Sequence, residues 1–371
     1  MATRRVASAV SAAAKAADPP SGTQVLLSTL PFLLMLAVAC VDVLAGPGAG
    51  FLPLLSLGPA LAAVSIRPVR TILIGLLAML VCLGLASYDD LVASRRELIA
   101  LATIAGVTAA GAIASAARRR REQELADVTA VAEAAQRVLL RPVPAQVGPA
   151  QVAVRYISAA AAARIGGDIY DVAEVGDAVR LIIGDVQGKG LGAVKTAAAV
   201  LGAFREAAYD TPDLPRLAER IELSLMRQTE GEEFVTSILA QISADGLRAE
   251  ILNCGHPPPL LVRGSRASFV QPREAGLPFG LAGLASAERH TVQDVALCPG
   301  DRLLFYTDGI SEARDRAGSF YSIEACATTF DGLDAETVLD RISKDVVRHV
   351  GHPLFDDAAL LLVASGPDGS A

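Results

Sequence analysis

Aspartates at the ends of apolar segments are the residues of this chain whose types and spacing could carry out chemistry. In the run LIIGDVQGKGL, Asp185 follows an aliphatic segment and precedes glycines. This pattern is typical of a buried strand that ends in a turn, where a charged group can approach the main chain closely. Such an aspartate on its own is most often a turn residue. The theme recurs, however, at Gly166-Gly167-Asp168, Tyr306-Thr307-Asp308-Gly309 and Phe355-Asp356-Asp357.

Four such acids at one rim would repel one another unless cations lay between them. An all-oxygen cluster without nearby His or Cys ligands suits Mn²⁺ or Mg²⁺ better than zinc. Two such ions can convert a bound water into hydroxide and stabilise the charge of phosphoryl transfer. The glycine loop is not a Walker nucleotide-binding loop, because Gly190 stands where Ser or Thr should bind magnesium. No Ser–His–Asp set is evident, and the position of His256 in a turn favours a structural or hydrogen-bonding role over a catalytic one.

Composition divides the chain of 371 residues into two unlike halves. Its apolar fraction of 52% and mean hydropathy of +0.43 are too high for an ordinary soluble protein. Residues 1–150 carry 13 basic and 9 acidic residues, whereas residues 151–371 carry 20 and 31. The acidic second half has no basic cluster, which argues against nucleic-acid binding. The five cysteines show neither ligand spacing nor a disulfide framework, so we expect packing residues in a reduced compartment.

Residues 1–121 are predicted to form a membrane region with four transmembrane helices. The apolar spans are Gln24–Ala45, Phe51–Ile66, Val69–Ser87 and Leu98–Ala117, of which the second is short. Nine basic residues (Arg4, Arg5, Lys15, Arg67, Arg70 and Arg118–Arg121) fall on one side, and Arg95 and Arg96 fall on the other. This asymmetry predicts a multi-pass protein of the plasma membrane with both termini cytoplasmic. Asp42, the one acid inside a span, is expected to reach the interface.

Residues 122–144 are predicted to form a linker helix. Leu125, Val128, Ala132, Ala135 and Leu139 recur at spacings of three and four, a narrow seam of the coiled-coil kind that could pair two chains. The alternative is that this segment is simply the first helix of the next domain. Arg141-Pro142 ends the helix, since proline disfavours helix at the residue before it.

Residues 145–365 are predicted to form an α+β domain with strands inside and helices outside. The middle strands follow one another through short turns, which favours antiparallel pairing. The strands expected are 152–158, 178–186, 236–242, 247–253, 260–262, 302–307 and 358–363. The helices expected are 192–209, 214–228 and 335–350.

These motifs, taken in order, resemble those of the metal-dependent protein phosphatases of the 2C type, in the bacterial branch typified by stage II sporulation protein E. The residues that carry the resemblance are GGDIYD from Gly166, GDVQGKG from Gly184, NCGHPP from Asn253, GLPFG from Gly276, PGDRLLFYTDG from Pro299, and the pair Asp356-Asp357. The resemblance covers about residues 145–365 and says nothing specific about the membrane region.

The resemblance implies a two-sheet β-sandwich flanked by helices, with two Mn²⁺ or Mg²⁺ ions at one rim. By the family pattern, Asp185 bridges both ions and the Val186 carbonyl joins it. The same pattern gives Asp308 and Asp356 to one ion, sets Asp168 on the side of the other, and makes Asp357 a supporting ligand. The implied reaction is attack of a metal-bound hydroxide on phosphoserine or phosphothreonine of a protein such as an anti-sigma-factor antagonist.

The sequence departs from the family pattern in two respects, and two other functions are compatible with it. Ala359 replaces the hydroxyl residue that usually follows the acid pair, which puts a local hydrogen bond in doubt. No arginine before the first motif stands out as a phosphate ligand, although Arg155 and Arg164 are available. The alternative functions are a catalytically silent pseudophosphatase that acts as a membrane signalling or binding module, and a metal-dependent small-molecule phosphatase.

Overall fold

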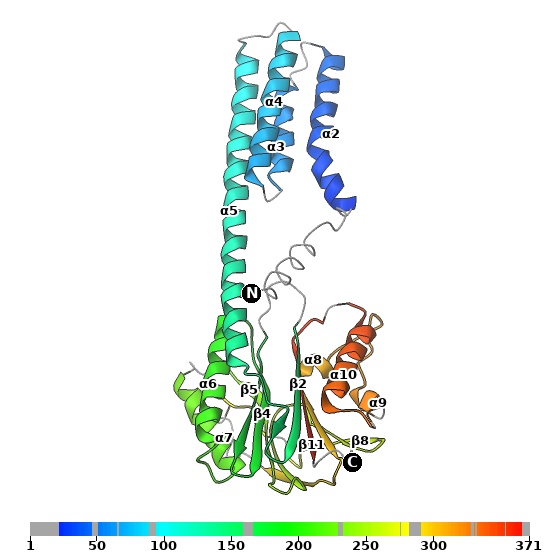
Figure 1. Ribbon diagram of the computed structural model, residues 1–371. Helices are drawn as coiled ribbons and strands as arrows, with labels where there is room; N and C mark the ends of the chain where they lie inside the picture. Colours follow the sequence, from blue (N-terminus) through cyan, green and yellow to red (C-terminus); the bar gives the residue numbers. More distant parts are fainter. Residues whose placement is uncertain are drawn as a thin grey trace, which may run out of the picture. The chain divides into compact units, whose positions relative to one another are not determined.

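The protein is divided into two compact units, Met1–Leu125 and Ala126–Ala371, in a computed structural model (Figure 1). The structure describes residues 22–46, 51–64, 67–88, 94–158, 166–228, 233–274, 276–281, 291–327, 330, 332–352 and 354–365. The sequence predictions that concern Arg4, Arg5, Lys15 and Arg164 lie outside these ranges. Each unit is described by itself below.

The N-terminal unit is helical, and the second of its four expected spans is shorter than the sequence predicted. Its helices are α2 (Gly22–Ala45), η1 (Leu52–Ser56), α3 (Leu57–Ala62), α4 (Pro68–Tyr88) and the first part of α5 (Arg95–Leu139). Within the described residues, three helices are long and apolar enough to cross a membrane, on α2, α4 and α5. The second expected span is instead the short apolar segment Leu52–Ala62. Pro53 and Pro59 lie inside it, and prolines interrupt the hydrogen bonding that a long helix needs.

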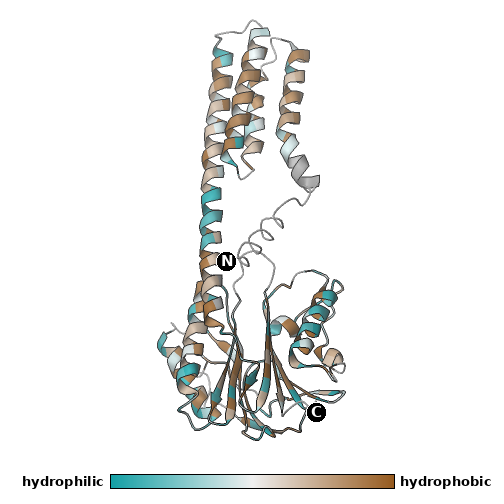
Figure 2. Ribbon diagram, in the orientation of Figure 1, coloured by the Kyte–Doolittle hydropathy of each residue, from teal (hydrophilic) through white to brown (hydrophobic). Residues whose placement is uncertain are grey.

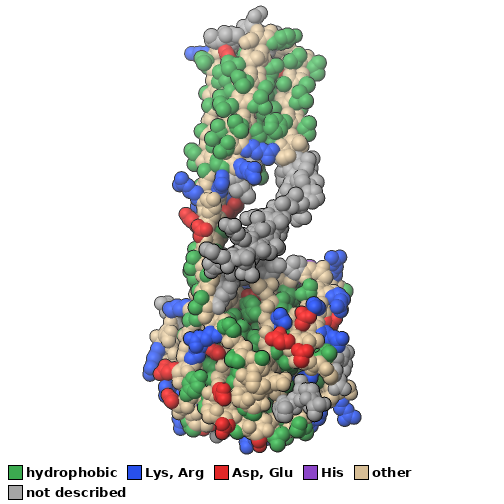
Figure 3. Space-filling view, in the orientation of Figure 1, with side chains coloured by type: hydrophobic (Ala, Val, Ile, Leu, Met, Phe, Trp, Pro, Cys, Tyr) green, Lys and Arg blue, Asp and Glu red, His purple; other side chains and the backbone are tan. Residues whose placement is uncertain are grey.

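The short segment returns the chain to the end of the unit at which α2 begins. Arg70, at the start of α4, donates a hydrogen bond from Nη2 to the Ser28 carbonyl at 2.5 Å. Arg118 donates from Nη1 to the Val64 carbonyl, just beyond α3, at 3.3 Å. Basic side chains therefore gather at one end of the helices, which the space-filling view shows as a basic band beneath an apolar surface (Figure 3).

These helices are built largely of apolar residues (Figure 2). Leu36, Leu73, Leu80 and Ile113 are each at least 60% exposed, whereas Ala78, Cys82 and Ala86 are buried between the helices. Small residues at the contacts between helices and large apolar residues on the surface are typical of helices that pack within a bilayer, although Leu55, Ile74 and Ile104 are buried here as well. Asp42 is buried rather than turned to the interface as the sequence predicted.

The second unit is a sandwich of two antiparallel sheets. One sheet has the order β1-β2-β11-β10-β7-β8 and the other the order β3-β4-β5-β6-β9. The strands of the first are β1 (Gln146–Val147), β2 (Ala150–Ile157), β7 (Leu260–Arg263), β8 (Arg266–Phe269), β10 (Arg302–Tyr306) and β11 (Ala358–Ser365). Those of the second are β3 (Asp168–Val175), β4 (Ala178–Val186), β5 (Val235–Ile242), β6 (Arg248–Cys254) and β9 (Val292–Ala296). This confirms the predicted fold class.

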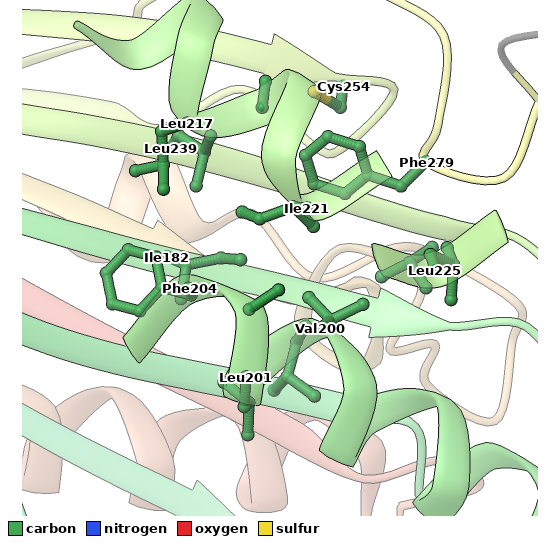
Figure 4. Packing of buried hydrophobic residues seen from close by; sticks show 14 of the residues in the cluster. Ile182, Val200, Leu201, Phe204, Leu217, Ile221, Leu225, Leu239, Cys254 and Phe279 are labelled. Atoms are coloured by element: carbon green, nitrogen blue, oxygen red, sulfur yellow. The ribbon is translucent and has the colours of Figure 1, made fainter. Parts of the chain in front are cut away.

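Helices cover the outer face of each sheet and create three separate hydrophobic layers. Helices α6 (Leu191–Ala207) and α7 (Leu214–Gln228) pack on the five-stranded sheet, where Phe204, Ile221 and Phe279 fill the space against Ile182 (Figure 4). Helices α8 (Asp308–Ser311), α9 (Ile323–Ala327) and α10 (Ala335–Val350) lie against the six-stranded sheet. A third cluster lies between the sheets. This layering fixes the strand ends, and thereby the acids they carry.

Arg180 on β4 ties α6 to the sheet from inside the core. Its side chain is buried, and Nη1 donates to the carbonyls of Ala208 at 2.7 Å and Thr211 at 2.8 Å, just beyond the end of α6. Nε donates to Gln241 Oε1 on the neighbouring strand at 2.6 Å. A guanidinium with five donors can satisfy the open carbonyls of a helix end in this way.

The last part of α5 belongs to the second unit, so the predicted seam does not form one continuous surface. Ala132 is buried against Val194 of α6, and Leu139 packs on the core beneath α6. Arg205 Nη2 donates to the Leu139 carbonyl at 2.6 Å. The large apolar side chains on the surface of this segment are those of Val128, Val131 and Val138, each at least 48% exposed.

Candidate metal centre

The predicted acids lie at neighbouring strand ends drawn from both sheets. Asp168 begins β3 and stands directly opposite Asp185 of β4 in the antiparallel register. Asp308 follows β10 and opens the short helix α8, and Asp356 and Asp357 immediately precede β11, the strand paired with β10. The structure therefore brings together residues that are up to 189 positions apart in the chain.

Thr307 links the two sheets at this rim. Its hydroxyl donates to Asp168 Oδ2 at 2.9 Å and accepts the Ala359 backbone N–H at 2.9 Å. The Thr307 N–H donates in turn to the Ala359 carbonyl at 3.1 Å. The main chain of Ala359 thus makes hydrogen bonds at the position where a hydroxyl side chain is missing.

Asp357 is buried and held by a hydrogen-bonded chain that begins on α5. The Tyr156 hydroxyl donates to Asp357 Oδ2 at 2.7 Å, and Gln136 Nε2 donates to the Tyr156 hydroxyl at 2.9 Å. Gln136 Nε2 also donates to the Gly166 carbonyl at 3.0 Å, two residues before Asp168. The end of the linker helix therefore contacts the acid cluster through a single intervening side chain.

Glycine is required at Gly167 because the main chain of a neighbouring strand passes directly over it. Val186 N–H donates to the Gly167 carbonyl at 3.1 Å. A methyl group at Gly167 would lie 2.6 Å from Asp185 Oδ1 and closer still to the Val186 carbonyl oxygen. The Val186 carbonyl and the Asp185 carboxylate, which the sequence predicts as neighbouring ligands, therefore lie on the same side of this glycine.

The acids raise one another's proton affinity. Burial, followed by the charges of Asp308 and Asp356, raises the pKa of Asp185 to about 7. Burial and the charge of Asp185 raise the pKa of Asp168 well above its ordinary value. Burial and Asp356 raise the pKa of Asp308. Like charges at short range disfavour joint ionisation, so the rim carries more negative charge than its surroundings balance.

This donor set fits hard divalent cations in both charge and chemistry. All its donors are carboxylate or carbonyl oxygens, which Mn²⁺ and Mg²⁺ accept. A cation bound between these carboxylates would favour their ionised forms, which burial and mutual repulsion otherwise disfavour. In the described part of the chain no three His, Cys, Asp or Glu side chains already converge as a ligand set, and the Lys189 ammonium pairs with Asp356 at 2.8 Å.

His256 is a buried structural residue by its contacts. Nδ1 lies 3.1 Å from Thr236 Oγ1 and Nε2 lies 3.1 Å from the Tyr306 carbonyl. The Nε2 proton is donated to that carbonyl, so Nδ1 accepts the Thr236 hydroxyl. Burial lowers the pKa of His256 to about 4, which keeps the ring neutral near pH 7. The histidine joins the strand that leads to Asp308 with the strand that flanks Asp185.

Sequence reasoning missed the residues that support the acids: Gln136, Tyr156 and Lys189, together with the role of Thr307. Arg155, one candidate phosphate ligand, lies on the opposite face of β2 from Tyr156, since neighbouring strand residues alternate. Its Nη2 pairs with Glu336 Oε2 of α10 at 3.1 Å. Successive residues of a strand point to opposite faces of its sheet. This alternation, applied to the expected strand 152–158, could have assigned Tyr156 to the face that packs on the other sheet.

Two antiparallel sheets, flanked by helices and carrying aspartates at one rim, define a phosphatase domain of the 2C type. The profile of the family Stage II sporulation protein E (SpoIIE) matches residues 176–365, half of the chain. The chain belongs to this family. Asp168 lies just outside the matched residues.

Individual proteins are also similar to this chain. Protein IcfG of Synechocystis is 24% identical over 234 residues, which are 54% of this chain and 36% of that protein. The chain thus spans about a third of that relative's length. The SiaA-PP2C domain of Pseudomonas aeruginosa has the same fold, with a TM-score of 0.53, 16% identity, and 67% of this chain and 99% of that domain covered. The RsbU and RsbW domains of a Mycobacterium tuberculosis protein give a TM-score of 0.49 at 25% identity, covering 59% and 61%.

Proposed function

We propose that this protein is a membrane-tethered, metal-dependent serine/threonine protein phosphatase. The observation that carries the proposal is the meeting of Asp168, Asp185, Asp308 and Asp356 at one rim, with raised carboxylate pKa values that call for cations. Membership of a family with a 2C-type phosphatase domain supports the same reaction.

In this proposal Asp185 would bridge two divalent cations, with Asp308 and Asp356 on one and Asp168 on the side of the other. The Val186 carbonyl would join the bridging carboxylate, and Asp357 would support the set. When bound, Mn²⁺ or Mg²⁺ supplies Lewis-acid activation of water and neutralises charge on the phosphoryl oxygens.

The chain itself orients these ligands. The Thr307 hydroxyl fixes one oxygen of Asp168, and the Tyr156 hydroxyl fixes one oxygen of Asp357. His256 holds the Tyr306 carbonyl and so the strand end that precedes Asp308. Ligands held by such outer hydrogen bonds need little rearrangement when a cation arrives.

The substrate class we propose is a phosphoserine or phosphothreonine protein, such as a phosphorylated anti-sigma-factor antagonist. Full-length protein in detergent should release phosphate from such a protein in the presence of Mn²⁺, and Asp308→Asn should abolish the release. Mn²⁺ binding without any release would favour the pseudophosphatase. Release from small phosphomonoesters but not from the phosphoprotein would favour the small-molecule phosphatase.

We propose further that the domain is cytoplasmic and held at the membrane by the apolar helices. The basic residues gathered around Arg70 and Arg118 at one end of the N-terminal unit support this orientation. A reporter fused after Arg121 should be cytoplasmic, and one inserted near Asp90 should be external. The reverse labelling would contradict the tethered phosphatase, because its substrates are intracellular.

The linker helix is the part of the chain we propose for homodimerisation and control. The exposed side chains of Val128, Val131 and Val138 are apolar and lie at spacings of three and seven on α5. Replacing the first two together by Asp should abolish cross-linking between copies in membranes and change turnover. A variant that still cross-links and turns over at the normal rate would leave this segment as a passive tether.

A further inference from the structure

The ammonium group of Lys189 forms an ion pair with Asp356, one of the acids of the candidate site. Its Nζ lies 2.8 Å from Asp356 Oδ2, although the two residues are 167 positions apart in the chain. The side chains are 39% and 45% exposed, so both face solvent at the mouth of the cluster. An exposed ion pair of this kind stabilises a fold only weakly, so it can be broken at little cost.

Lys189 also lies four positions after Asp185, on the loop that follows β4. One short stretch of chain therefore carries both an acid of the site and a cation beside it. Arg155 is engaged with Glu336 on the other face of its sheet. Lys189 is therefore a cation that the rim can offer to an incoming anion.

The backbone around Lys189 permits its side chain to change partners. Gly188 and Gly190 flank it with φ angles of 96° and 86°, in the left-handed region that glycine adopts without strain. A methyl group at either glycine would meet no heavy atom within 4 Å, so the loop stands in open space. The ammonium is carried on a four-carbon stem with rotatable bonds, and this stem gives it reach across the mouth of the cluster.

We propose that Lys189 binds the phosphoryl group of the substrate, and that its ammonium leaves Asp356 for that group once the acids hold divalent cations. The proposal rests on the proposed function. A carboxylate that binds a cation no longer attracts an ammonium, and the ammonium is then repelled by the cation. A phosphomonoester, with its three acceptor oxygens, is the partner that restores charge balance.

If Lys189 pairs with Asp356 in the metal-free protein and binds phosphate in the metal-bound protein, a single variant should change the affinities for Mn²⁺ and for phosphate in opposite directions. Lys189→Met keeps the length of the side chain and removes the charge. Full-length protein in detergent should then bind Mn²⁺ up to about fivefold more tightly by calorimetry, because no ion pair has to break. Inorganic phosphate, titrated in Mg²⁺ and followed by ³¹P NMR, should bind about tenfold or more weakly, since a charge-assisted hydrogen bond is lost.

Two further variants separate this role from a general effect of charge or folding. Lys189→Arg should retain phosphate binding. Lys195→Met removes an exposed charge from α6, in the same stretch of chain, and should change neither affinity. The assignment is overturned if Lys189→Met binds phosphate as tightly as the wild type, or if it loses Mn²⁺ and phosphate affinity together. Both readouts are binding measurements, so a wild type that binds both ligands but hydrolyses no phosphoprotein would refute the proposed function alone.

Discussion

The charge of Asp185 should destabilise the metal-free protein, and removing it should reveal by how much. The pKa of this carboxyl is raised from the ordinary 3.8 to about 7 by burial and by Asp308 and Asp356. A carboxyl whose pKa is raised in the fold stabilises it only at low pH. That contribution is present below about pH 4 and is lost as the pH rises through about 7.

The size of the effect follows from the shift. At about 1.4 kcal/mol per pH unit, the difference between 3.8 and about 7 sets an upper limit of about 4 kcal/mol. Asp185→Asn keeps the shape and cannot ionise, so its metal-free form should be more stable than the wild type at pH 8. A domain of this size changes its melting temperature by about 2–4 °C per kcal/mol, which predicts a rise of several degrees.

The assay is calorimetric unfolding of the full-length protein in detergent with a chelator, at pH 8 and pH 5. The advantage of Asp185→Asn should be largest at pH 8 and should shrink at pH 5. Mn²⁺ should reverse the order, since only the wild type would keep its bridging ligand, and activity should fall by several orders of magnitude. Asp177→Asn, in the exposed turn at the far end of the same strand pair, is the matched control. A variant no more stable than the wild type at pH 8 would refute the electrostatic reasoning, and equal stabilisation by Mn²⁺ would remove Asp185 from the site.

Three other substitutions test the supports of the site. Tyr156→Phe deprives buried Asp357 of a hydroxyl donor, a loss of about 1–3 kcal/mol, so Mn²⁺ affinity measured by calorimetry should fall about tenfold; an unchanged affinity would show that the hydroxyl is dispensable. Gly167→Ala should abolish phosphatase activity while the circular dichroism spectrum stays native, whereas Gly192→Ala, with space around it, should remain active; equal activities would contradict the close approach. Arg180→Met leaves carbonyls at the end of α6 without their donor and should destabilise the domain by about 3 kcal/mol or more in thermal unfolding, and a native melting temperature would rule out that anchoring role.

Most of the fold follows from local sequence, because its strands are short apolar runs bounded by turns. The seven expected strands all exist, and the one that carries Asp185 ends at Val186 as predicted. Strand β3 was missed because its sequence DIYDVAEV carries an acid at every third position, which places acids on both faces of a strand and is typical of a surface segment. Asp171 can be buried there only because Arg205 of α6 pairs with it. That partner lies 34 positions away and leaves no signal in the local pattern.

The location of the acids at strand ends was predictable, but the contacts that hold them were not. Each aspartate stands beside an apolar run, so its position at a strand end could be read directly. The contact of Lys189 with Asp356 and that of Tyr156 with Asp357 join segments 167 and 201 positions apart. Such contacts depend on which strands become neighbours, which periodicity does not specify.

The acids come from strands of both sheets, so the site exists only while the sandwich is assembled. Asp168 and Asp185 belong to one sheet, and Asp308 and Asp356 flank strands of the other. Any ion bound across this rim would hold the sheets together and favour the native state by mass action. Divalent cation supply would then set how often the sandwich opens to cellular proteases. We therefore expect the lifetime of the protein in the cell to shorten under manganese and magnesium starvation, so that its abundance as well as its activity would follow the supply of these metals.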